Sequence, residues 1–568
     1  MWKAAKEELI KNRCPVTVRA DGSVKYNIRA FAAFKKISVM KHTFTLFLFL
    51  FLGTAAFACT NILVTKGASA DGSTFLVYLN DGEWLYHLNV TPAADHNPGD
   101  SLEYTSLSGK KYKIAQVPHT YAIVGFQINE YQLAIGETTF TGRTELWDKT
   151  QPLKYWDLMR LALLRAKTAR EAIRVMTSLA EKYGYGSEGE TFSIADPNEA
   201  WLLEMVGTGG KGGAIWVARR VPDGMMTAHA NHSRIGTFPL HDPQNCLYSK
   251  NVIRFAKKAG YWNPKSGKPF AFNNAYDPPS PAHLKYTETR VWSIFRRAAP
   301  SQHFSMDYNR GIPGAKRYPL FIKPDKKLRL QDVFALVRDH YEGTPLDMTQ
   351  LPDAGPFGNP NRVRPLEWKT DSADYSWERP ISTYNTAFSF VAQLRNYLPD
   401  NVGGLIWFGE DDTYTNCYFP IYCSVTDVAK PYKTGDIFHY SPKSAWWVFN
   451  FAANYANTRY DLISKDIRKV QHELESRFIR QQDSIEKLAL QKQGAGRIAF
   501  LTRYSETAGN LVYQRWLKLG YQLVTKYNDG YIKENGHIKA EPYPKSWRDY
   551  IIRQEPEKHK IRQWPGKK

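Results

Sequence analysis

Cysteine is scarce in this sequence: only five occur, Cys14, Cys59, Cys246, Cys417 and Cys423. So small a number excludes a fold built on a disulfide framework. Cys417 and Cys423 stand in the stretch NCYFPIYCS, and their spacing matches neither a CxxC redox motif nor a zinc site. They form either a local disulfide or two buried thiols, and the sequence leaves both possibilities open.

A long apolar segment is also missing. A membrane-spanning helix needs about 20 consecutive apolar residues, and the most apolar run, from Phe44 to Leu52, is much shorter. The glycine cluster GTGGKGG lacks the Lys-Ser/Thr pair of a phosphate-binding loop, and there is no internal repeat. We therefore expect no stable membrane insertion of the mature protein and no cofactor.

Positive charge, in contrast, is abundant: the formal net charge is +21, from 76 Lys and Arg against 55 Asp and Glu. A nucleic-acid-binding protein would concentrate this charge on one face or in a motif, and the sequence shows neither pattern. We therefore expect a basic solvated surface and no nucleic-acid partner. The 43% hydrophobic and 14% aromatic content is typical of a packed globular protein.

The first 58 residues are predicted to be a targeting segment. The stretch MKHTFTLFLFLFLGTAAFA, residues 40–58, has a basic start, a short apolar run and an Ala-Phe-Ala end, which is the layout of a secretory signal peptide. Translation is expected to start at Met40, and a long basic leader that begins at Met1 is the alternative. The predicted location is secreted or periplasmic.

Cleavage after Ala58 would make Cys59 the first residue of the mature protein. Lipoprotein signals also end before a cysteine, so lipid attachment to Cys59 is the alternative. Such signals favour Leu three residues before the cysteine and a small residue at the next position, where this chain has Ala56 and Phe57. Because Ala-x-Ala accepts a bulky middle residue and the lipoprotein pattern does not, ordinary cleavage is favoured.

A cysteine at the N-terminus places a nucleophile and a base on one residue. A thiol with a pKa of about 8.5 is only a few per cent ionised at neutral pH. An α-amine, with a pKa of about 7.7–8, becomes a usable base after a modest lowering of that pKa. The amine would take the thiol proton during attack and return it to the leaving group, while other groups donate hydrogen bonds to the oxyanion.

The residues after Cys59 predict a β-hairpin. The stretch CTNILVTKG has the residue alternation expected of a strand and is rich in β-branched residues. ASADGS is predicted to be a turn, and TFLVYLND is predicted to be the returning strand. This hairpin would bring Asp81 back towards Cys59. Asp81 precedes Gly82, however, and an Asp-Gly pair can also be an ordinary turn.

Six blocks follow one another along the chain: ACTNILVTKGASADGST, INEYQLAIGETTFTGR, GSEGETFSIADPNEAWLLEMVG, WVARRVPDGMMTAHANHSRI, YTETRVWSIFRRAAPS and WFGEDDTYTNCYFPIYCS. Together they resemble the dipeptidase A family of cysteine peptidases. That family belongs to the N-terminal nucleophile hydrolases and is distantly related to bile salt hydrolases and penicillin V acylases. The resemblance runs from Cys59 to about Asn457 and implies an α+β fold with four layers in the order αββα.

The resemblance also implies roles for five residues. Cys59 corresponds to the nucleophile, and Asp81 corresponds to the carboxylate that orients its amine. Asn231 in HANHSRI corresponds to an oxyanion-binding residue, and Arg290 in TETRVWS corresponds to an active-site arginine. Thr139 in GETTF matches a second polar donor only loosely.

Two of these residues also have ordinary structural interpretations. Asn231 could cap the end of a strand, and Arg290 could be an exposed base on the helix expected over residues 282–300. The sequence also departs from the hallmark Arg-Asn-x-Asp of relatives, because Tyr78 stands where that arginine would be. A tyrosine can only donate or accept a hydrogen bond, so the stabilisation of the thiolate is left open.

Two histidines, His229 and His232, flank Asn231 as HxxH. No carboxylate or cysteine lies beside them at ligand spacing, and the expected mechanism needs no metal, so no metal site is predicted. Glu204, in the stretch AWLLEMVG, is expected to be half-buried in a strand without an assigned role.

The chain is expected to have three parts. These are the leader (1–58), a peptidase domain (59–457) and a helical extension with a basic tail (458–568). Periodic apolar residues predict one helix over 155–184, an amphipathic helix over 461–493 that packs on the body, and a second helix around 506–527. AWLLEMVG, AIWVARRV and MMTAHANH are predicted to be strands.

The expected function is that of a secreted cysteine-type dipeptidase. It would hydrolyse dipeptides or short peptides through a thioester on Cys59, which water then cleaves. One alternative is an amidase or acylase of the same fold, acting on N-acyl or bile-salt-type substrates. The other is a lipid-anchored envelope protein that binds peptides without cleaving them.

Overall fold

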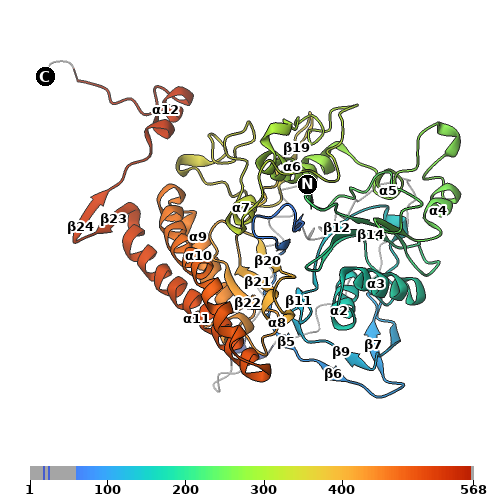
Figure 1. Cartoon of the computed structure of the whole chain (residues 1–568). Helices are drawn as coiled ribbons and strands as arrows, with labels where there is room; N and C mark the ends of the chain where they lie inside the picture. Colours follow the sequence, from blue (N-terminus) through green and yellow to red (C-terminus); the bar gives the residue numbers. More distant parts are fainter. Residues whose placement is uncertain (1–16, 19–23, 26–58, 565–568) are drawn as a thin grey trace. The chain divides into compact units, whose positions relative to one another are not determined.

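The computed structural model describes residues 17–18, 24–25 and 59–564 (Figure 1). The two short segments are strands β1 (Thr17–Val18) and β2 (Val24–Lys25), which pair with each other in a unit of their own, Met1–Thr54. The predicted signal peptide, residues 40–58, and its cleavage site lie outside the described residues. The second unit is Ala55–Lys568, and it holds the fold described next.

One antiparallel sheet has six strands in the order β16-β3-β4-β20-β21-β22. The strands are β3 (Thr60–Val64), β4 (Thr74–Asp81), β16 (Met226–His229), β20 (Thr386–Leu394), β21 (Leu405–Glu410) and β22 (Phe419–Tyr422). β3 and β4 form the expected hairpin, in which Thr60 pairs with Leu79. This register places Cys59, which directly precedes β3, beside the end of β4 and therefore near Asp81.

The other large sheet has eight strands in the order β17-β15-β14-β13-β12-β11-β10-β5. They are β5 (Val90–Thr91), β10 (Ile123–Val124), β11 (Ile128–Asn129), β12 (Ala134–Phe140), β13 (Gly189–Ala195), β14 (Ala200–Val206), β15 (Ile215–Arg220) and β17 (Cys246–Tyr248). The strands predicted from AWLLEMVG, AIWVARRV and MMTAHANH are confirmed as β14, β15 and β16.

The two sheets pack face to face through β3 and β4 on one side and β12 and β13 on the other. They approach so closely at Gly136 that a Cβ atom there would lie 2.9 Å from the Cβ of Tyr78. A side chain at position 136 would therefore force the two sheets apart beside Tyr78.

Helices cover the outer faces of both sheets (Figure 1). α2 (Tyr155–Arg165) and α3 (Ala169–Tyr183) pack on the eight-stranded sheet. α9 (Ala445–Ala456), α10 (Tyr460–Leu490) and α11 (Gly494–Tyr527) pack on the six-stranded sheet. α6 (Pro281–Ala298) lies against β16. The expected mixed α+β composition is therefore confirmed.

Shorter elements connect or decorate these layers. They are β6 (Ala94–Asp95), β7 (Ser101–Thr105), β8 (Lys111–Ala115), β9 (His119–Thr120), β18 (Glu367–Lys369), β19 (Asp374–Ser376), β23 (Tyr531–Glu534), β24 (His537–Ala540), α4 (Val252–Lys258), α5 (Phe272–Tyr276), α7 (Leu330–Leu336), α8 (Asp400–Gly403) and α12 (Lys545–Gln554). None of the helices within the described residues has an apolar stretch long enough to cross a membrane.

One helix prediction is wrong in detail. Residues 155–184 form two helices, α2 and α3, instead of one. Ala166 has extended backbone angles, and the Thr168 side chain accepts a hydrogen bond from the Glu171 N–H. Threonine is a favoured N-cap, so Thr168 starts a new helix where the apolar periodicity alone continues.

The helix expected over 461–493 is confirmed as α10, and α11 begins well before the predicted residue 506. Apolar residues of both helices, including Phe478 and Trp516, belong to the same hydrophobic core as strands β3 and β4. The four cysteines of the described second unit are free, so Cys417 and Cys423 are two buried thiols.

Candidate active site

Cys59 is fully buried among polar side chains. Its Sγ donates to Glu137 Oε1 at 3.5 Å, and it lies 4.0 Å from the Tyr78 hydroxyl and 3.9 Å from Asn80 Nδ2. Burial, followed by the negative charges of Glu137 and Asp81, raises the pKa of the thiol well above its ordinary range, although a backbone hydrogen bond from Asp81 opposes this. The resting thiol is therefore protonated, and its attack on a carbonyl requires a base.

Asp81 is the last residue of β4, and it is not part of a turn. Its buried carboxylate forms an ion pair with Arg379 and accepts a hydrogen bond from Thr386 Oγ1 at 2.6 Å. Burial raises the pKa of Asp81, and Arg379 and Thr386 offset only part of that effect. The carboxyl group of Asp81 is thus fixed in direction beside Cys59.

Arg290 connects Cys59 to Asn231. It lies on α6 and is fully buried, so the alternative of an exposed base is wrong. Its guanidinium donates to the Cys59 carbonyl oxygen at 2.7 Å, to Thr60 Oγ1 at 3.0 Å and to Asn231 Oδ1 at 3.0 Å. These bonds fix the backbone at Cys59 and the side chain of Asn231 relative to each other.

Asn231 follows the end of β16 and has a positive φ of 59°. Asparagine tolerates this left-handed conformation better than most residues, and strained backbones of this kind occur often at functional sites. Its Nδ2 donates to the Thr139 carbonyl oxygen at 2.7 Å, and its own carbonyl oxygen lies 2.8 Å from His283 Nε2. Neighbours therefore fix both its side chain and its backbone.

Thr139 lies opposite Glu190 in the pairing of β12 with β13. Its hydroxyl donates to Glu190 Oε2 at 2.9 Å, so the hydroxyl hydrogen points at that carboxyl group. Only the carbonyl of Thr139 contacts another predicted site residue, Asn231. The structure thus connects Cys59, Arg290, Asn231 and Thr139 by hydrogen bonds, and Asp81 adjoins Cys59.

A pair of buried acids, Glu137 and Glu190, was missed by sequence reasoning. They hydrogen-bond to each other, and burial followed by the charge of Glu137 raises the pKa of Glu190 well above its ordinary value. Glu190 is therefore protonated and donates to Glu137, which accepts from the Cys59 thiol. The available signal was a glutamate in each of two Gly-Glu-Thr stretches, which the structure places in β12 and β13.

Tyr78 does not take over the role of an arginine. Its hydroxyl donates to Glu137 and accepts from Asn80 Nδ2 at 2.5 Å, so its hydrogen is directed at the acid pair. A guanidinium reaches Asp81 from Arg379 instead, a residue 298 positions away in the sequence. No local pattern marks Arg379, because only the packing of the segment before β20 brings it to β4.

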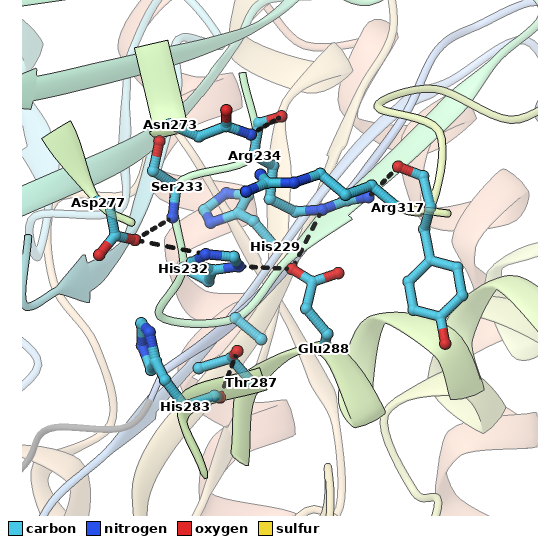
Figure 2. A network of polar contacts seen from close by, with 12 residues as sticks. His229, His232, Ser233, Arg234, Asn273, Asp277, His283, Thr287, Glu288 and Arg317 are labelled. Carbon is cyan, nitrogen blue, oxygen red and sulfur yellow. Dashed lines mark hydrogen bonds and ion pairs between the residues drawn. The ribbon is translucent and has the colours of Figure 1, made fainter. Parts of the chain in front are cut away.

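The two histidines of HxxH have separate environments. His229 contacts Thr138 Oγ1 and Ser193 Oγ, each at 2.7 Å, and burial lowers its pKa to about 3. It is a neutral core histidine that links the two sheets. His232 points instead into the polar network of Figure 2, towards Asp277 and Glu288.

Glu204 is fully buried in β14, not half-buried, and it holds the loop after Asn231. Its carboxyl oxygens accept hydrogen bonds from Ser233 Oγ at 2.5 Å, from Arg234 N at 2.6 Å and from Ile235 N at 3.1 Å. Burial raises the pKa of Glu204 to about 7, although these bonds oppose the shift.

Comparison with known proteins identifies a peptidase family and relatives named as dipeptidases. Residues 58–473 match Peptidase family C69. A probable dipeptidase of Latilactobacillus sakei is 26% identical over 487 residues, which cover 83% of this chain and 95% of the relative. A probable dipeptidase of Salmonella dublin is 26% identical over 401 residues (67% of this chain, 83% of the relative), and dipeptidase A of Lactobacillus helveticus is 24% identical over 429 residues (71% and 82%). The resemblance to dipeptidases is confirmed: the chain belongs to peptidase family C69 and is a peptidase hydrolase.

Proposed function

We propose that this enzyme is a cysteine-type dipeptidase whose nucleophile is Cys59 at the N-terminus of the processed chain. The observation that carries the proposal is the buried Cys59 thiol, surrounded by Asp81, Glu137 and Arg290 at the start of β3. The dipeptidase names of the relatives support short peptides as substrates. Two packed sheets between helical layers support the fold of the N-terminal nucleophile hydrolases.

In the proposed reaction, Cys59 Sγ attacks the scissile carbonyl carbon while the α-amine of Cys59 takes the thiol proton. The amine then gives this proton to the departing amino group, which leaves a thioester on Cys59. Water hydrolyses the thioester with the same amine as base. An adjacent base is needed because burial, and after it the charges of Glu137 and Asp81, raise the pKa of the Cys59 thiol.

The neighbouring residues would position these groups. Asp81, fixed by Arg379 and Thr386, is proposed to orient the amine. Asn231, which Arg290 fixes from one side, is proposed to donate to the oxyanion that develops during attack. Donors that are already in place when charge develops are the most effective, because they need no reorganisation during the reaction.

Processing after Ala58 and export from the cytoplasm belong to the same proposal. The signal-peptide layout of residues 40–58 supports both. Lipid attachment to the Cys59 thiol would consume the proposed nucleophile, and membership of a peptidase family favours an enzyme over a peptide-binding protein.

The test is hydrolysis by the secreted wild type and by Cys59→Ala, Cys59→Ser and Cys246→Ala. We expect loss of activity by orders of magnitude in both Cys59 variants and retention in Cys246→Ala, whose thiol lies on β17. A panel of dipeptides, N-acyl amino acids and conjugated bile acids separates a dipeptidase from an acylase. Preferred cleavage of the acylated compounds would contradict the proposed substrate class.

A further inference from the structure

Three potential metal ligands, His232, Asp277 and His283, lie close together (Figure 2). His232 follows β16, Asp277 ends α5, and His283 lies in the first turn of α6. One ring nitrogen of each histidine and one carboxylate oxygen all lie within 4.8 Å of one another. Asp277 thus supplies the carboxylate that the sequence around His232 does not show.

His232 Nε2 is an unsatisfied atom that points towards Asp277. The side chain of His232 is 1% exposed. Among the residues that the structure describes, Nε2 has no hydrogen-bond partner, and Asp277 Oδ2 lies 3.8 Å away. That distance is too long for a hydrogen bond. It is a few tenths of an ångström longer than the roughly 3.4 Å between two ligands bonded to one tetrahedral zinc ion at about 2.0–2.1 Å, so zinc binding would require a small movement of these side chains. Burial of an unsatisfied polar atom is unfavourable, and a metal ion would remove this cost.

The other ring nitrogen of His232, Nδ1, faces a carboxylate, an arrangement that is common in metal sites. Nδ1 lies 3.1 Å from Glu288 Oε1. Arg234 Nε lies 3.5 Å from the same oxygen, so Glu288 is held as a carboxylate that accepts a hydrogen from Nδ1. The lone pair of His232 is therefore on Nε2. A carboxylate behind a metal-binding histidine fixes the ring and strengthens it as a ligand.

His283 is also in the form that a metal requires. Its Nε2 lies 2.8 Å from the Asn231 carbonyl oxygen, an acceptor, so Nε2 carries a hydrogen and Nδ1 carries the lone pair. Metal binding needs neutral histidines and an ionised carboxylate.

The charges around the cluster leave room for a cation. Glu204 acts electrostatically on the same region as Asp277, and Glu288 borders it from α6. Arg234 lies 3.5 Å from Glu288 and compensates one of these acids. A divalent cation would balance the negative charge of Asp277.

We propose that His232, Asp277 and His283 bind one Zn²⁺ ion, with water in a fourth position. Two imidazole nitrogens and one carboxylate suit Zn²⁺ in tetrahedral geometry, whereas Mg²⁺ and Ca²⁺ prefer oxygen ligands alone. The ion would fix His283, which contacts the backbone of Asn231. This positioning effect rests on the proposed function of Asn231, but zinc binding itself does not.

The test measures zinc bound to the full chain, expressed without a histidine tag, stripped with a chelator and titrated with Zn²⁺ alone. Three ligand variants, His232→Gln, Asp277→Asn and His283→Gln, remove a metal ligand. An amide in each can still form the hydrogen bond that the native side chain makes to Glu288, Ser233 N or the Asn231 carbonyl. The matched control is His340→Gln. His340 is also buried, contacts a carboxylate (Glu342) through Nδ1 at 3.1 Å, and has an Nε2 without a hydrogen-bond partner among the described residues.

We expect one Zn²⁺ per chain in the wild type and in His340→Gln, and a rise in their unfolding temperature on zinc addition. Affinity should fall at least about tenfold in each ligand variant. Co²⁺ in the wild type should give the visible absorption of a tetrahedral site, which tests the geometry even where a variant fails to fold. The proposal would be overturned if the wild type bound no stoichiometric zinc, or if the double variant Asp277→Asn/His283→Gln retained zinc. Co²⁺ bound without the absorption bands of a tetrahedral site would also overturn it. None of these readouts depends on peptidase activity.

Discussion

At the scale of single residues, burial and the nearby acids raise the pKa of the Cys59 thiol. Glu137 accepts hydrogen bonds from Cys59 and Tyr78, and Glu190 donates a shared proton to it. One negative charge therefore remains beside the sulfur and disfavours the thiolate. This arrangement suits a nucleophile that loses its proton only as it attacks.

Replacement of Glu190 tests the shared proton. Glu190→Gln keeps an N–H that can donate to Glu137, whereas Glu190→Ala leaves Glu137 and Thr139 without a partner at this position. We expect Glu190→Ala to lower the free energy of unfolding by about 1–3 kcal/mol and Glu190→Gln to lower it clearly less, as measured by urea denaturation. Equal losses in the two variants would contradict a donor role for Glu190.

Replacement of Glu137 tests the charge beside the sulfur. Glu137→Gln removes a negative charge next to Cys59, which favours the thiolate and lowers the pKa of the thiol. We expect the midpoint of the pH dependence of Cys59 alkylation to shift to lower pH relative to the wild type. A midpoint that stays in place or moves to higher pH would show that Glu137 does not control the thiol.

At the scale of structural elements, the loop after β16 joins the active site to the buried polar network. Glu204 accepts hydrogen bonds from Ser233, Arg234 and Ile235, and His283 contacts the Asn231 carbonyl. The backbone at Asn231 is thus fixed from β14 and from α6. Conditions that change the charge of Glu204 should therefore change the stability of this loop.

The raised pKa of Glu204 predicts a pH dependence of stability. Between its ordinary value of 4.5 and its folded value of about 7, Glu204 binds more protons in the folded state than in the unfolded state. Its contribution to stability is therefore present at low pH and is lost as the pH rises through this range, by an amount on the order of 3 kcal/mol.

The measurement is the unfolding temperature of the wild type and of Glu204→Gln between pH 5 and pH 8 at about the same ionic strength. Glutamine does not titrate, so the unfolding temperature of the wild type minus that of the variant should decrease as the pH rises. A difference that is independent of pH would contradict the assigned pKa of Glu204.

The sequence predicts helices and strands where the pattern that indicates them is local. It predicts only some of the residues of the candidate site. The alternation of CTNILVTKG and the turn ASADGS are enough to place Asp81 beside Cys59, and the register confirms the hairpin. The break at Thr168 was missed because apolar periodicity continues across it. Arg379 and the acid pair were missed because their partners lie in strands or loops far away in the sequence. A side chain whose role depends on packing between two sheets is not marked by a pattern in the sequence around it.

At the scale of the whole second unit, α10 and α11 are part of the core that supports the site. Phe478 and Trp516 are buried against the six-stranded sheet. Glu475, on α10, forms a buried ion pair with Arg338 and also accepts a hydrogen bond from the Tyr418 N–H. The helices beyond residue 457 should therefore contribute to global stability.

Replacement of Trp516 tests this contribution. Trp516→Ala removes a fully buried ring from α11, and we expect the free energy of unfolding to fall by about 3–5 kcal/mol. The control on the same helix is Tyr521→Ala, whose native side chain is 64% exposed and whose loss should cost little. Comparable costs for the two variants would show that α11 is not part of the core.

The central claim is that sulfur and free amine share the first residue of the active enzyme. The most direct measurement is the intact mass, with N-terminal sequencing, of the active protein purified after secretion. We expect a chain that begins at Cys59 with an unmodified amine and thiol. An active enzyme that still carries Ala58, or that has a lipid on Cys59, would contradict it.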